Sequence, residues 1–292
     1  MNKHILLALM AAVWTWANLV EPFHPRLRRR TLSIDKLPRS LDGFTILHLS
    51  DLHTRKMGVL ERTTIALLSQ ASADIAVLTG DLLDTENGIE PLRQVLAHVR
   101  ARLGVYVVWG NAEHQLAPPS HKDALERCLR EAGMHLLNND ARFLTYDDAT
   151  IWLAGVDDPH SGHADLPGVT PHGRIADLHL LLAHSPDVLL HPLTGQYDLI
   201  LCGHTHGGQI RLPGWGALWS HTRLGRWAGD YVLTPSQIAR RLHRPLPQPY
   251  VIISPGIATV GPLLLKARLF CPPEMTVIRL QATSSVPAHT QD

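Results

Sequence analysis

The sequence predicts an α/β fold, in which short apolar strands alternate with amphipathic helices along the first half of the chain. Apolar runs occur at residues 44–50, 75–79 and 105–109, and helical periodicity lies between them. Strand–helix alternation of this kind builds parallel β-α-β units. Each run also ends in a short polar cluster, and such sheets bind ligands beyond the carboxyl ends of their strands. We therefore expect the functional site at that edge of the sheet.

Helices and further strands are expected along the rest of the domain. The predicted helices cover residues 58–71, 91–102 and 121–132. The next three strands lie too close together for helical crossovers, so antiparallel or mixed pairing is expected there. These strands cover residues 135–137, 142–146 and 151–155. Later strands are predicted at 178–183, 199–201, 250–254 and 274–280, with an irregular segment at 211–249.

The composition is that of a globular chain. Of its 292 residues, 45% are apolar and 18% are charged, a balance that allows a large core and excludes a disordered chain. The net charge of +1 gives no electrostatic reason to expect nucleic acid as a partner. Cys128, Cys202 and Cys271 are too few and too scattered for a disulfide framework or a thiolate zinc site, so we expect free thiols in a reducing compartment.

A continuous apolar segment lies near the N-terminus, at residues 5–20. As a helix it would span about 24 Å against about 30 Å of hydrocarbon, which suffices if Trp14 and Trp16 lie at an interface. Thr15-Trp16-Ala17 also resembles a cleavage site, so a signal peptide with export is the alternative. Four arginines at residues 26–30 follow the segment. They favour an uncleaved anchor with the remaining chain in the cytoplasm.

These observations divide the chain into four parts. We assign residues 1–20 to a membrane anchor or signal segment, 21–42 to a basic linker, 43–282 to the folded domain and 283–292 to a polar tail. The arginines of the linker are expected to be solvated or to contact anionic lipid.

Two histidines lie two residues apart in the glycine-flanked stretch Cys202-Gly203-His204-Thr205-His206-Gly207-Gly208. In extended backbone their imidazoles would point to the same side, and the glycines would allow a ligand to approach the backbone closely. Polar side chains also follow the other predicted strands. Together, the candidate metal ligands are Asp51, His53, Asp81, Asn111, His184, His204 and His206.

This set contains two carboxylates, one amide and four imidazoles. Such ligands suit Mn, Fe, Co or Zn better than Ca or Mg, and they exceed the four that a structural zinc takes. They fit two divalent ions that share a bridging carboxylate. Such a site would attract phosphate and lower the pKa of a bound water from 15.7 to about 7, which provides a hydroxide nucleophile at neutral pH.

The order D-x-H, G-D-x-x-D, G-N-x-E, H and G-H-T-H resembles the calcineurin-like metallophosphoesterase family over residues 43–280. Residues 50–53, 183–187 and 203–209 are similar to its bacterial branch with an N-terminal membrane segment, which includes phosphodiesterases and UDP-2,3-diacylglucosamine pyrophosphatases. The resemblance implies a four-layer sandwich of two mixed β-sheets flanked by helices, at the bacterial inner membrane. It also implies a first metal on Asp51, His53 and His206, a second on Asn111, His184 and His204, and Asp81 as the bridge.

One position departs from the family pattern. The family usually has G-N-H-D or G-N-H-E, where the histidine is the proposed acid for the leaving group, but Ala112 stands at that place. His114, on the same loop, is the candidate acid instead. A pyrophosphate releases a good leaving group, which needs less protonation than an alkoxide. Ala112 therefore favours activated or pyrophosphate substrates.

Three further residues are candidates for supporting roles. Asp84 and Glu113 are predicted to orient histidine ligands, and Arg55 is predicted to bind substrate phosphate. The alternatives are a helix cap for Asp84 and ordinary surface charges for the other two.

The sequence thus predicts a dimetal phosphohydrolase at the membrane that cleaves phosphodiester or pyrophosphate bonds, with a nucleotide-linked lipid as the best single candidate substrate. Its expected partners are that substrate and the membrane, with no nucleic acid. The alternative, prompted by Ala112, is a metal-binding regulatory protein with weak or no turnover. A metal-dependent amidohydrolase is disfavoured, because those chains begin with H-x-H after their first strand.

Overall fold

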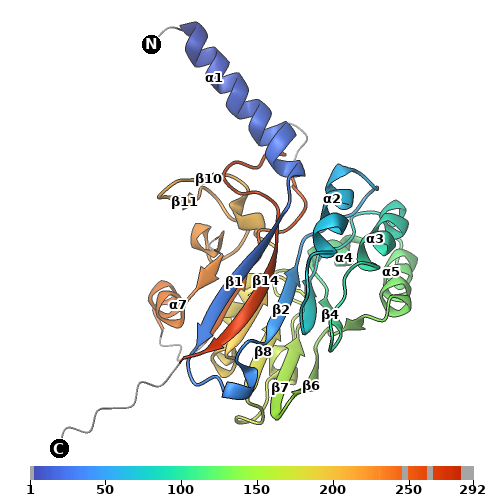
Figure 1. Ribbon diagram of the computed structural model, residues 1–292, viewed down its shortest axis with the longest axis vertical. Coiled ribbons are helices and arrows are strands. Elements are labelled where there is room, and N and C mark those ends of the chain that lie inside the picture. The colour runs from blue at the N-terminus through green and yellow to red at the C-terminus, as the bar shows by residue number, and fades with distance from the viewer. Residues whose placement is uncertain (1–2, 230, 245–248, 262–265, 284–292) are drawn as a thin grey trace, which may run out of the picture.

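The computed structural model describes residues 3–229, 231–244, 249–261 and 266–283. Two six-stranded mixed sheets pack against each other, and helices cover the outer side of each (Figure 1). In order across the first sheet lie β1 (Arg26–Ile34), β14 (Glu274–Ala282), β2 (Thr45–Leu49), β3 (Ile75–Thr79), β4 (Val105–Val108) and β5 (His135–Leu136). In order across the second lie β12 (Val232–Leu233), β13 (Tyr250–Ile253), β9 (Leu199–Cys202), β8 (Leu178–Leu182), β7 (Ala149–Gly155) and β6 (Asp140–Tyr146). The predicted α/β sandwich is confirmed.

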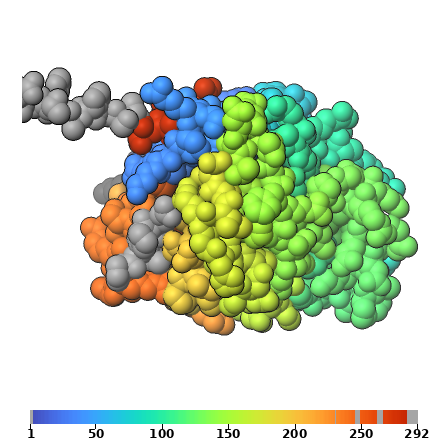
Figure 2. Space-filling view, turned by 90° about the horizontal axis from the view of Figure 1, so that it is seen from below, coloured from blue at the N-terminus to red at the C-terminus, as the bar shows by residue number. Residues whose placement is uncertain are grey.

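Helices occupy the connections between the strands. They are α1 (Lys3–Thr15), α2 (Val59–Leu68), α3 (Ile89–Leu96), α4 (Asn111–Gln115), α5 (Ser120–Glu131), α6 (Leu166–Val169) and α7 (Pro235–Leu242). A short ribbon of β10 (Arg211–Leu212) and β11 (Gly216–Ala217) forms a third, two-stranded sheet. Seen from the end opposite α1, the earlier part of the chain (blue to green) and the later part (yellow-green to orange) lie side by side in one body (Figure 2).

The core follows from the alternation of side chains along each strand. In β2, Ile46 faces the cluster between the two sheets, whereas Leu47 faces the cluster under α2 and α3, because successive strand residues point to opposite faces. Leu180 of β8 joins Ile46 between the sheets, and Leu181 faces the cluster on the other side of the second sheet. The central strands of both sheets are thus buried on both faces, which explains their continuous apolar runs.

Parallel pairing brings the ends of the strands together. β2, β3 and β4 pair in parallel, and so do β7, β8, β9 and β13. β6 pairs with β7 in antiparallel fashion, which agrees with the predicted change of pairing in that region. The loops that follow β2, β3, β4, β8 and β9 therefore lie at neighbouring ends of the two sheets, where the predicted polar clusters occur.

The prediction of a basic linker over residues 21–42 is wrong. Residues 26–34 form β1, which pairs in parallel with β14 along its whole length. Arg28 and Arg30 lie on the same face of this edge strand, and both bind the buried carboxylate of Glu274, at 3.4 and 3.2 Å. The charged residues concealed the strand pattern, because Arg28 and Arg30 take positions on the face where buried Leu32 and Ile34 follow. The folded domain consequently starts before residue 43.

The N-terminal segment forms one long helical arm. α1 continues through the π-helical turn η1 (Trp16–Val20) and the 3₁₀ turn η2 (Glu21–Phe23), and none of the residues of α1 is buried. The arm projects from one end of the domain (Figure 1). By length and composition, residues 3–23 could cross a membrane. At the other terminus, residues 284–292 of the predicted polar tail lie outside the described part of the chain.

Candidate dimetal site

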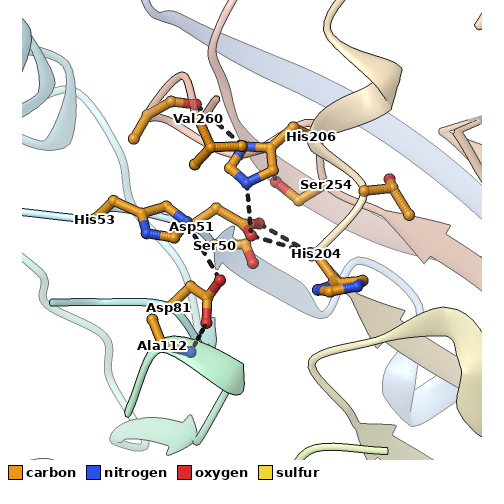
Figure 3. A network of polar contacts seen from close by, with 12 residues as sticks. Ser50, Asp51, His53, Asp81, Ala112, His204, His206, Ser254 and Val260 are labelled. Carbon is orange, nitrogen blue, oxygen red and sulfur yellow. Dashed lines mark hydrogen bonds and ion pairs between the residues drawn. The ribbon is translucent and has the colours of Figure 1, made fainter. Parts of the chain in front are cut away.

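The strand ends bring the seven predicted metal ligands into one place. Six of them make up two of the three groups of potential ligand atoms found there, which we call the first cluster (Asp51, His53 and His206) and the second cluster (Asp81, His184 and His204). The third group consists of His160, His204 and His221. Asn111 joins the second cluster, because its Oδ1 lies 3.2 Å from His184 Nε2. Residues from both sheets thus meet in one site, as the close-up shows for five of them (Figure 3).

Asp81 lies between the two clusters. Its Oδ2 is 3.2 Å from His53 Nε2 and 3.4 Å from His184 Nε2. Each cluster is also compact in itself, because His206 Nε2 lies 3.5 Å from Asp51 Oδ1, and His204 Nδ1 lies 3.1 Å from His184 Nε2. One carboxylate therefore contacts both ligand groups, which is the arrangement that two neighbouring cations require.

The backbone at these residues is unusual. Left-handed conformations occur at Asp51, His53, Asp81, His204 and His206, with φ between 41° and 67°. Each costs about 1–2 kcal/mol for a residue that carries a Cβ, and such strain clusters at functional sites. The surrounding hydrogen bonds hold it in place; both carboxylate oxygens of Asp51, for example, accept from the backbone N–H of His204 at 3.1 Å.

This conformation corrects one expectation about the H-x-H pair. We expected extended backbone that would point His204 and His206 to the same side, but both residues are left-handed. Both imidazoles still face the same cavity, yet His204 belongs to the second cluster and His206 to the first. The pair therefore supplies one ligand to each group.

Three of the imidazoles are held so that one nitrogen faces the site. His53 Nδ1 binds Asp84 Oδ1 at 2.6 Å, His184 Nδ1 binds the carbonyl of Thr79 at 2.7 Å, and His206 Nδ1 binds the carbonyl of Ala258 at 3.1 Å. A partner of this kind fixes the tautomer and leaves Nε2 as the ligand atom. Asp84 thus contacts a predicted ligand, at the position where a supporting role was predicted.

Burial and close charges shift the pKa values of the site residues in opposite directions. Burial works to raise the pKa of Asp81, but the neighbouring His184 and His53 hold it well below its usual range. Burial works to lower the pKa of His184, but the charge of Asp81 raises it to about 10. Burial and the charge of His184 lower the pKa of His204 to about 2.

The residues present fit two divalent cations. Buried carboxylates need a compensating charge, and buried imidazole nitrogens without hydrogens are strong donors to borderline metals. His204 Nε2 is buried and has no hydrogen-bond partner among the residues that the structure describes. The ligand atoms are thus free to bind metal ions, and without such ions their burial would cost free energy.

Comparison with known proteins agrees with this geometry. Residues 44–208 match the family described as calcineurin-like phosphoesterase. The chain belongs to this family. It is 30% identical over 212 residues to the uncharacterized metallophosphoesterase YkuE of Bacillus subtilis, which covers 70% of this chain and 72% of YkuE.

Two further relatives of this metallophosphoesterase carry more descriptive names. The transmembrane protein with metallophosphoesterase domain of Bos taurus is 30% identical over 307 residues, which covers 95% of this chain and 62% of that protein. The phosphodiesterase YaeI of Escherichia coli is 30% identical over 174 residues, covering 58% of this chain and 63% of YaeI. Hydrolysis of phosphoesters is therefore the chemistry of this enzyme, and metal binding is part of it.

The structure directs His114 away from the metallophosphoesterase cavity. Its Nε2 binds Asp157 Oδ1 at 2.6 Å, and its ring stacks on His163 at 3.9 Å between centroids. His114 is not among the described residues that line the cavity, and its side chain is paired with Asp157 instead. Ala112 instead donates its backbone N–H to Asp81 Oδ1 at 2.8 Å (Figure 3).

Glu113 also differs from its prediction. Its carboxylate accepts from three backbone N–H groups, those of Asp81, Leu82 and Gly110, at 2.7 to 3.0 Å, and it orients no histidine. Burial, followed by the nearby charge of Asp81, raises its pKa to about 7. Glu113 thus joins the loops after β3 and β4 and fixes the position of Asp81.

Two histidines that the sequence did not single out face the second cluster. The ring of His160 lies 4.6 Å from that of His204, and the ring of His221 stacks at 5.2 Å from it. The buried Asp187 positions both: its Oδ2 binds His160 Nδ1 at 3.0 Å, and its Oδ1 accepts from Thr222 Oγ1 and the backbone of Arg223. His221 also lines the cavity of about 560 Å³ above the clusters.

Proposed function

We propose that this protein is a membrane-associated dimetal phosphohydrolase that cleaves phosphodiester or pyrophosphate bonds. The observation that carries the proposal is the position of Asp81 Oδ2, which lies within 3.4 Å of an imidazole nitrogen from each cluster. A structural zinc would need four ligands and no shared carboxylate. The name of the relative YaeI, a phosphodiesterase, supports a phosphodiester as the simplest substrate.

The proposed ligand assignment follows the two clusters. The first ion would bind Asp51, His53 and His206, the second would bind Asn111, His184 and His204, and Asp81 would bridge them. When bound, two such ions supply a nucleophile at neutral pH and neutralise charge on the phosphate. Mn, Fe, Zn and Co all suit this set of nitrogen and oxygen donors.

The remaining residues of the cavity would act on the substrate. His221 lies on the side of His204, with His160 beside it. His221 can donate its N–H to a phosphate oxygen or to the departing oxygen, which the methyl group of Ala112 cannot do. A pyrophosphate, whose leaving group needs little protonation, remains the substrate that tolerates this change most easily.

A lipid-linked substrate is supported by a second cavity, which runs from the helical arm to the site. This groove of about 760 Å³ is lined by Trp14, Leu19 and Phe23 from the arm, and it reaches His53 and Asp84. Arg55, the predicted phosphate ligand, and Lys56 line the same groove. Apolar walls at the arm and basic side chains near the site suit an acyl chain and a phosphate, respectively.

The helical arm supports a location at the membrane. Residues 3–23 are long and apolar enough to span a bilayer, and a relative is named as a transmembrane protein. The arginines that follow the arm favour a domain on the cytoplasmic side of a bacterial inner membrane. Export after cleavage at residue 17 is the alternative.

The test is metal-dependent hydrolysis by the full-length chain in detergent. We expect Mn²⁺, added after chelation, to support hydrolysis of bis-p-nitrophenyl phosphate. His204→Ala should reduce turnover by about 100-fold or more, since even residues behind the metal ligands contribute 10–100-fold. His98→Ala, which changes an exposed histidine whose ring binds the carbonyl of Gln94, is the matched control. Two bound ions per chain without turnover on diesters or pyrophosphates would instead support the regulatory alternative.

A further inference from the structure

Exposed apolar side chains gather around the base of the helical arm. Outside residues 3–23, nine large hydrophobic side chains are exposed in the described part of the chain, and five of them lie in two adjoining segments. We call these five the collar: Leu212, Trp215, Leu218, Trp219 and Phe270. Trp215 is 71% exposed and Trp219 is 65% exposed, values that a soluble surface rarely gives to two tryptophans so close together in the chain.

The collar is directly connected to the arm by hydrogen bonds. The segment at residues 268–271 contacts the arm, because the N–H of Arg268 donates to the carbonyl of Ala17 at 2.8 Å, and the N–H of Phe270 donates to Glu21 Oε2 at 3.2 Å. The same segment holds the start of β10, since the N–H of Arg211 donates to the carbonyl of Leu269 at 2.9 Å. Figure 1 shows β10 and β11 at the end of the domain from which α1 leaves.

The chemistry of the collar fits a bilayer surface. Tryptophan is enriched where hydrocarbon meets water, and Leu212 and Leu218 add exposed apolar area beside it. The guanidinium of Arg226 lies 5.9 Å from the ring of Trp215, and Arg223 is exposed nearby in the chain; cations of this kind attract anionic headgroups. Because the arm places a membrane at this end, the lipid surface is the apolar partner continuous with the collar.

We propose that the collar is a second membrane contact, which docks the domain onto the bilayer beside the arm. A single spanning helix would leave the domain free to tilt. Contact through the ribbon would hold one side of the domain down and set the mouth of the cavity, lined by Trp219 and His221, at the lipid surface. The inference rests on the membrane location proposed above and does not depend on turnover.

Site-directed spin labelling of the full-length chain in vesicles of phosphatidylcholine and phosphatidylglycerol tests the proposal. Trp215→Cys reports the collar, Val13→Cys reports the arm, and Phe143→Cys on β6 reports the opposite end of the domain. All three positions are exposed, and the native cysteines are buried, so the label should attach to the introduced thiol. The readout is the accessibility of each label to oxygen, which concentrates in lipid, and to a water-soluble nickel chelate.

The expected result is a label at Trp215→Cys that resembles the arm, with high oxygen and low nickel accessibility, and a label at Phe143→Cys that is aqueous. If the label at Trp215→Cys is as accessible to nickel as the label at Phe143→Cys, while the label at Val13→Cys lies in lipid, the proposed membrane contact of the collar is wrong. The membrane anchor would still stand. A label shielded from both agents would indicate a second copy of the chain on the collar and also overturns it. If Val13→Cys is itself aqueous, the proposed membrane location fails together with the collar.

A triple variant provides an independent measurement. Leu212→Ser, Trp215→Ser and Leu218→Ser together remove the apolar side chains but leave Trp219 in the cavity. Hydrolysis of a soluble diester in detergent should change less than twofold, which also shows that the variant is folded. Hydrolysis of a phospholipid or lipid-linked pyrophosphate in vesicles should fall at least tenfold. An equal rate on vesicles would contradict the collar, whereas the absence of turnover in wild-type protein on every substrate would count only against the proposed catalytic function.

Discussion

Asp84 determines which nitrogen of His53 faces the metal site, and this makes it a sensitive position. Asp84→Ala removes the 2.6 Å contact with His53 Nδ1 and frees the ring to rotate. We expect the affinity for Mn²⁺ to fall about 10–100-fold, the usual cost of losing a carboxylate behind a histidine ligand. Titration of activity against Mn²⁺ concentration measures this. Asp148→Ala, at an exposed position, is the control. Asp84 also binds Arg55, whose Nε lies 2.6 Å from Asp84 Oδ2, and equal Mn²⁺ affinities in the two variants would show that this ion pair is the main role of Asp84.

His221 is expected to matter most for substrates with poor leaving groups. His221→Phe keeps a ring against Trp219 and His204 but removes the N–H donor. Turnover of an alkyl phosphodiester should fall about 100-fold, and turnover of a p-nitrophenyl ester far less, because donation to the leaving oxygen is worth 10²–10⁴-fold when that oxygen is basic. Bound metal should stay unchanged. His172→Phe, which alters an exposed histidine, is the matched control, and equal losses on both esters would exclude a role at the leaving group.

The two kinds of site residue differ in how visible they are in a sequence. All seven proposed metal ligands could be found, because each directly follows a buried apolar strand and parallel pairing brings such ends together. His160 and His221 lie in loops whose sequence has no periodicity, and Asp187 connects them across regions far apart in the chain. Only the three-dimensional path of those loops reveals the contact. The contact of His114 with Asp157 was not foreseen for the same reason, since nothing in the sequence indicates this partner.

Among the elements, the start of β9 depends on one buried carboxylate. Asp198 accepts from the N–H of His179 at 2.8 Å and from Arg174 at 2.9 Å. Burial works to raise its pKa, but hydrogen bonds from His179 and Arg174 hold it below the usual value. A depressed carboxyl pKa stabilises the fold above the unfolded pKa of about 3.9, and that contribution is lost as the pH falls through the folded value.

Asp198→Asn should therefore lower the free energy of unfolding by about 1.5–3 kcal/mol at pH 7, the range for hydrogen bonds to a charged group. Below about pH 4 the difference between wild type and variant should shrink. Thermal unfolding at pH 7 and pH 3.5 measures both. Asp148→Asn, at an exposed position, is the control. A constant difference at both pH values would contradict the ionised role of Asp198.

β1 and α7 are two elements that were not predicted from the sequence, because charged residues in one and prolines and glycines around the other hid the regular pattern. In β1, Arg28 and Arg30 occupy the same face as the buried Leu32 and Ile34, so the alternation of apolar residues is interrupted in the first half of the strand. α7 lies in the segment expected to be irregular. Its start nevertheless has the sequence of a helix N-terminus, with Thr234 as the cap, Pro235 at the first position and Gln237 at the third, a pattern that predicts a helix. The apolar central strands were predicted to within a residue or two, because burial on both faces gives each of them a short, continuous apolar run bounded by polar residues.

At the scale of the whole molecule, the base of the helical arm is built into the active-site end of the domain. Glu21 is buried and its carboxylate accepts from Trp16 Nε1 at 2.7 Å and from the N–H of Cys271 at 2.6 Å. The fully buried Arg268, whose backbone binds Ala17, sends its guanidinium to the carbonyl of Ala258, which His206 Nδ1 also contacts. A path of direct contacts thus joins the arm to a proposed metal ligand.

This connection predicts that two truncations will behave differently. Deletion of residues 2–13 removes most of α1 but keeps Glu21 and β1, so the domain should fold and hydrolyse a soluble diester. Deletion of residues 2–30 also removes Glu21, Arg28 and Arg30, and it leaves Glu274, whose side chain is only 4% exposed, without its cations. Loss of the partners of a buried charge costs about 3 kcal/mol or more, in addition to the lost strand pairing with β14.

Thermal unfolding and metal content of the two truncated proteins measure the effect. We expect a clearly lower melting temperature and weaker metal binding for the longer deletion. If both deletions give equally stable proteins with equal metal content, the arm is only a tether and its contacts with residues 268–271 do not support the site. If only the longer deletion fails, the segment that looks like an anchor and a linker in the sequence is a structural part of the catalytic domain. Cleavage at residue 17 would then leave a working enzyme only because it keeps Glu21 and β1 in the chain.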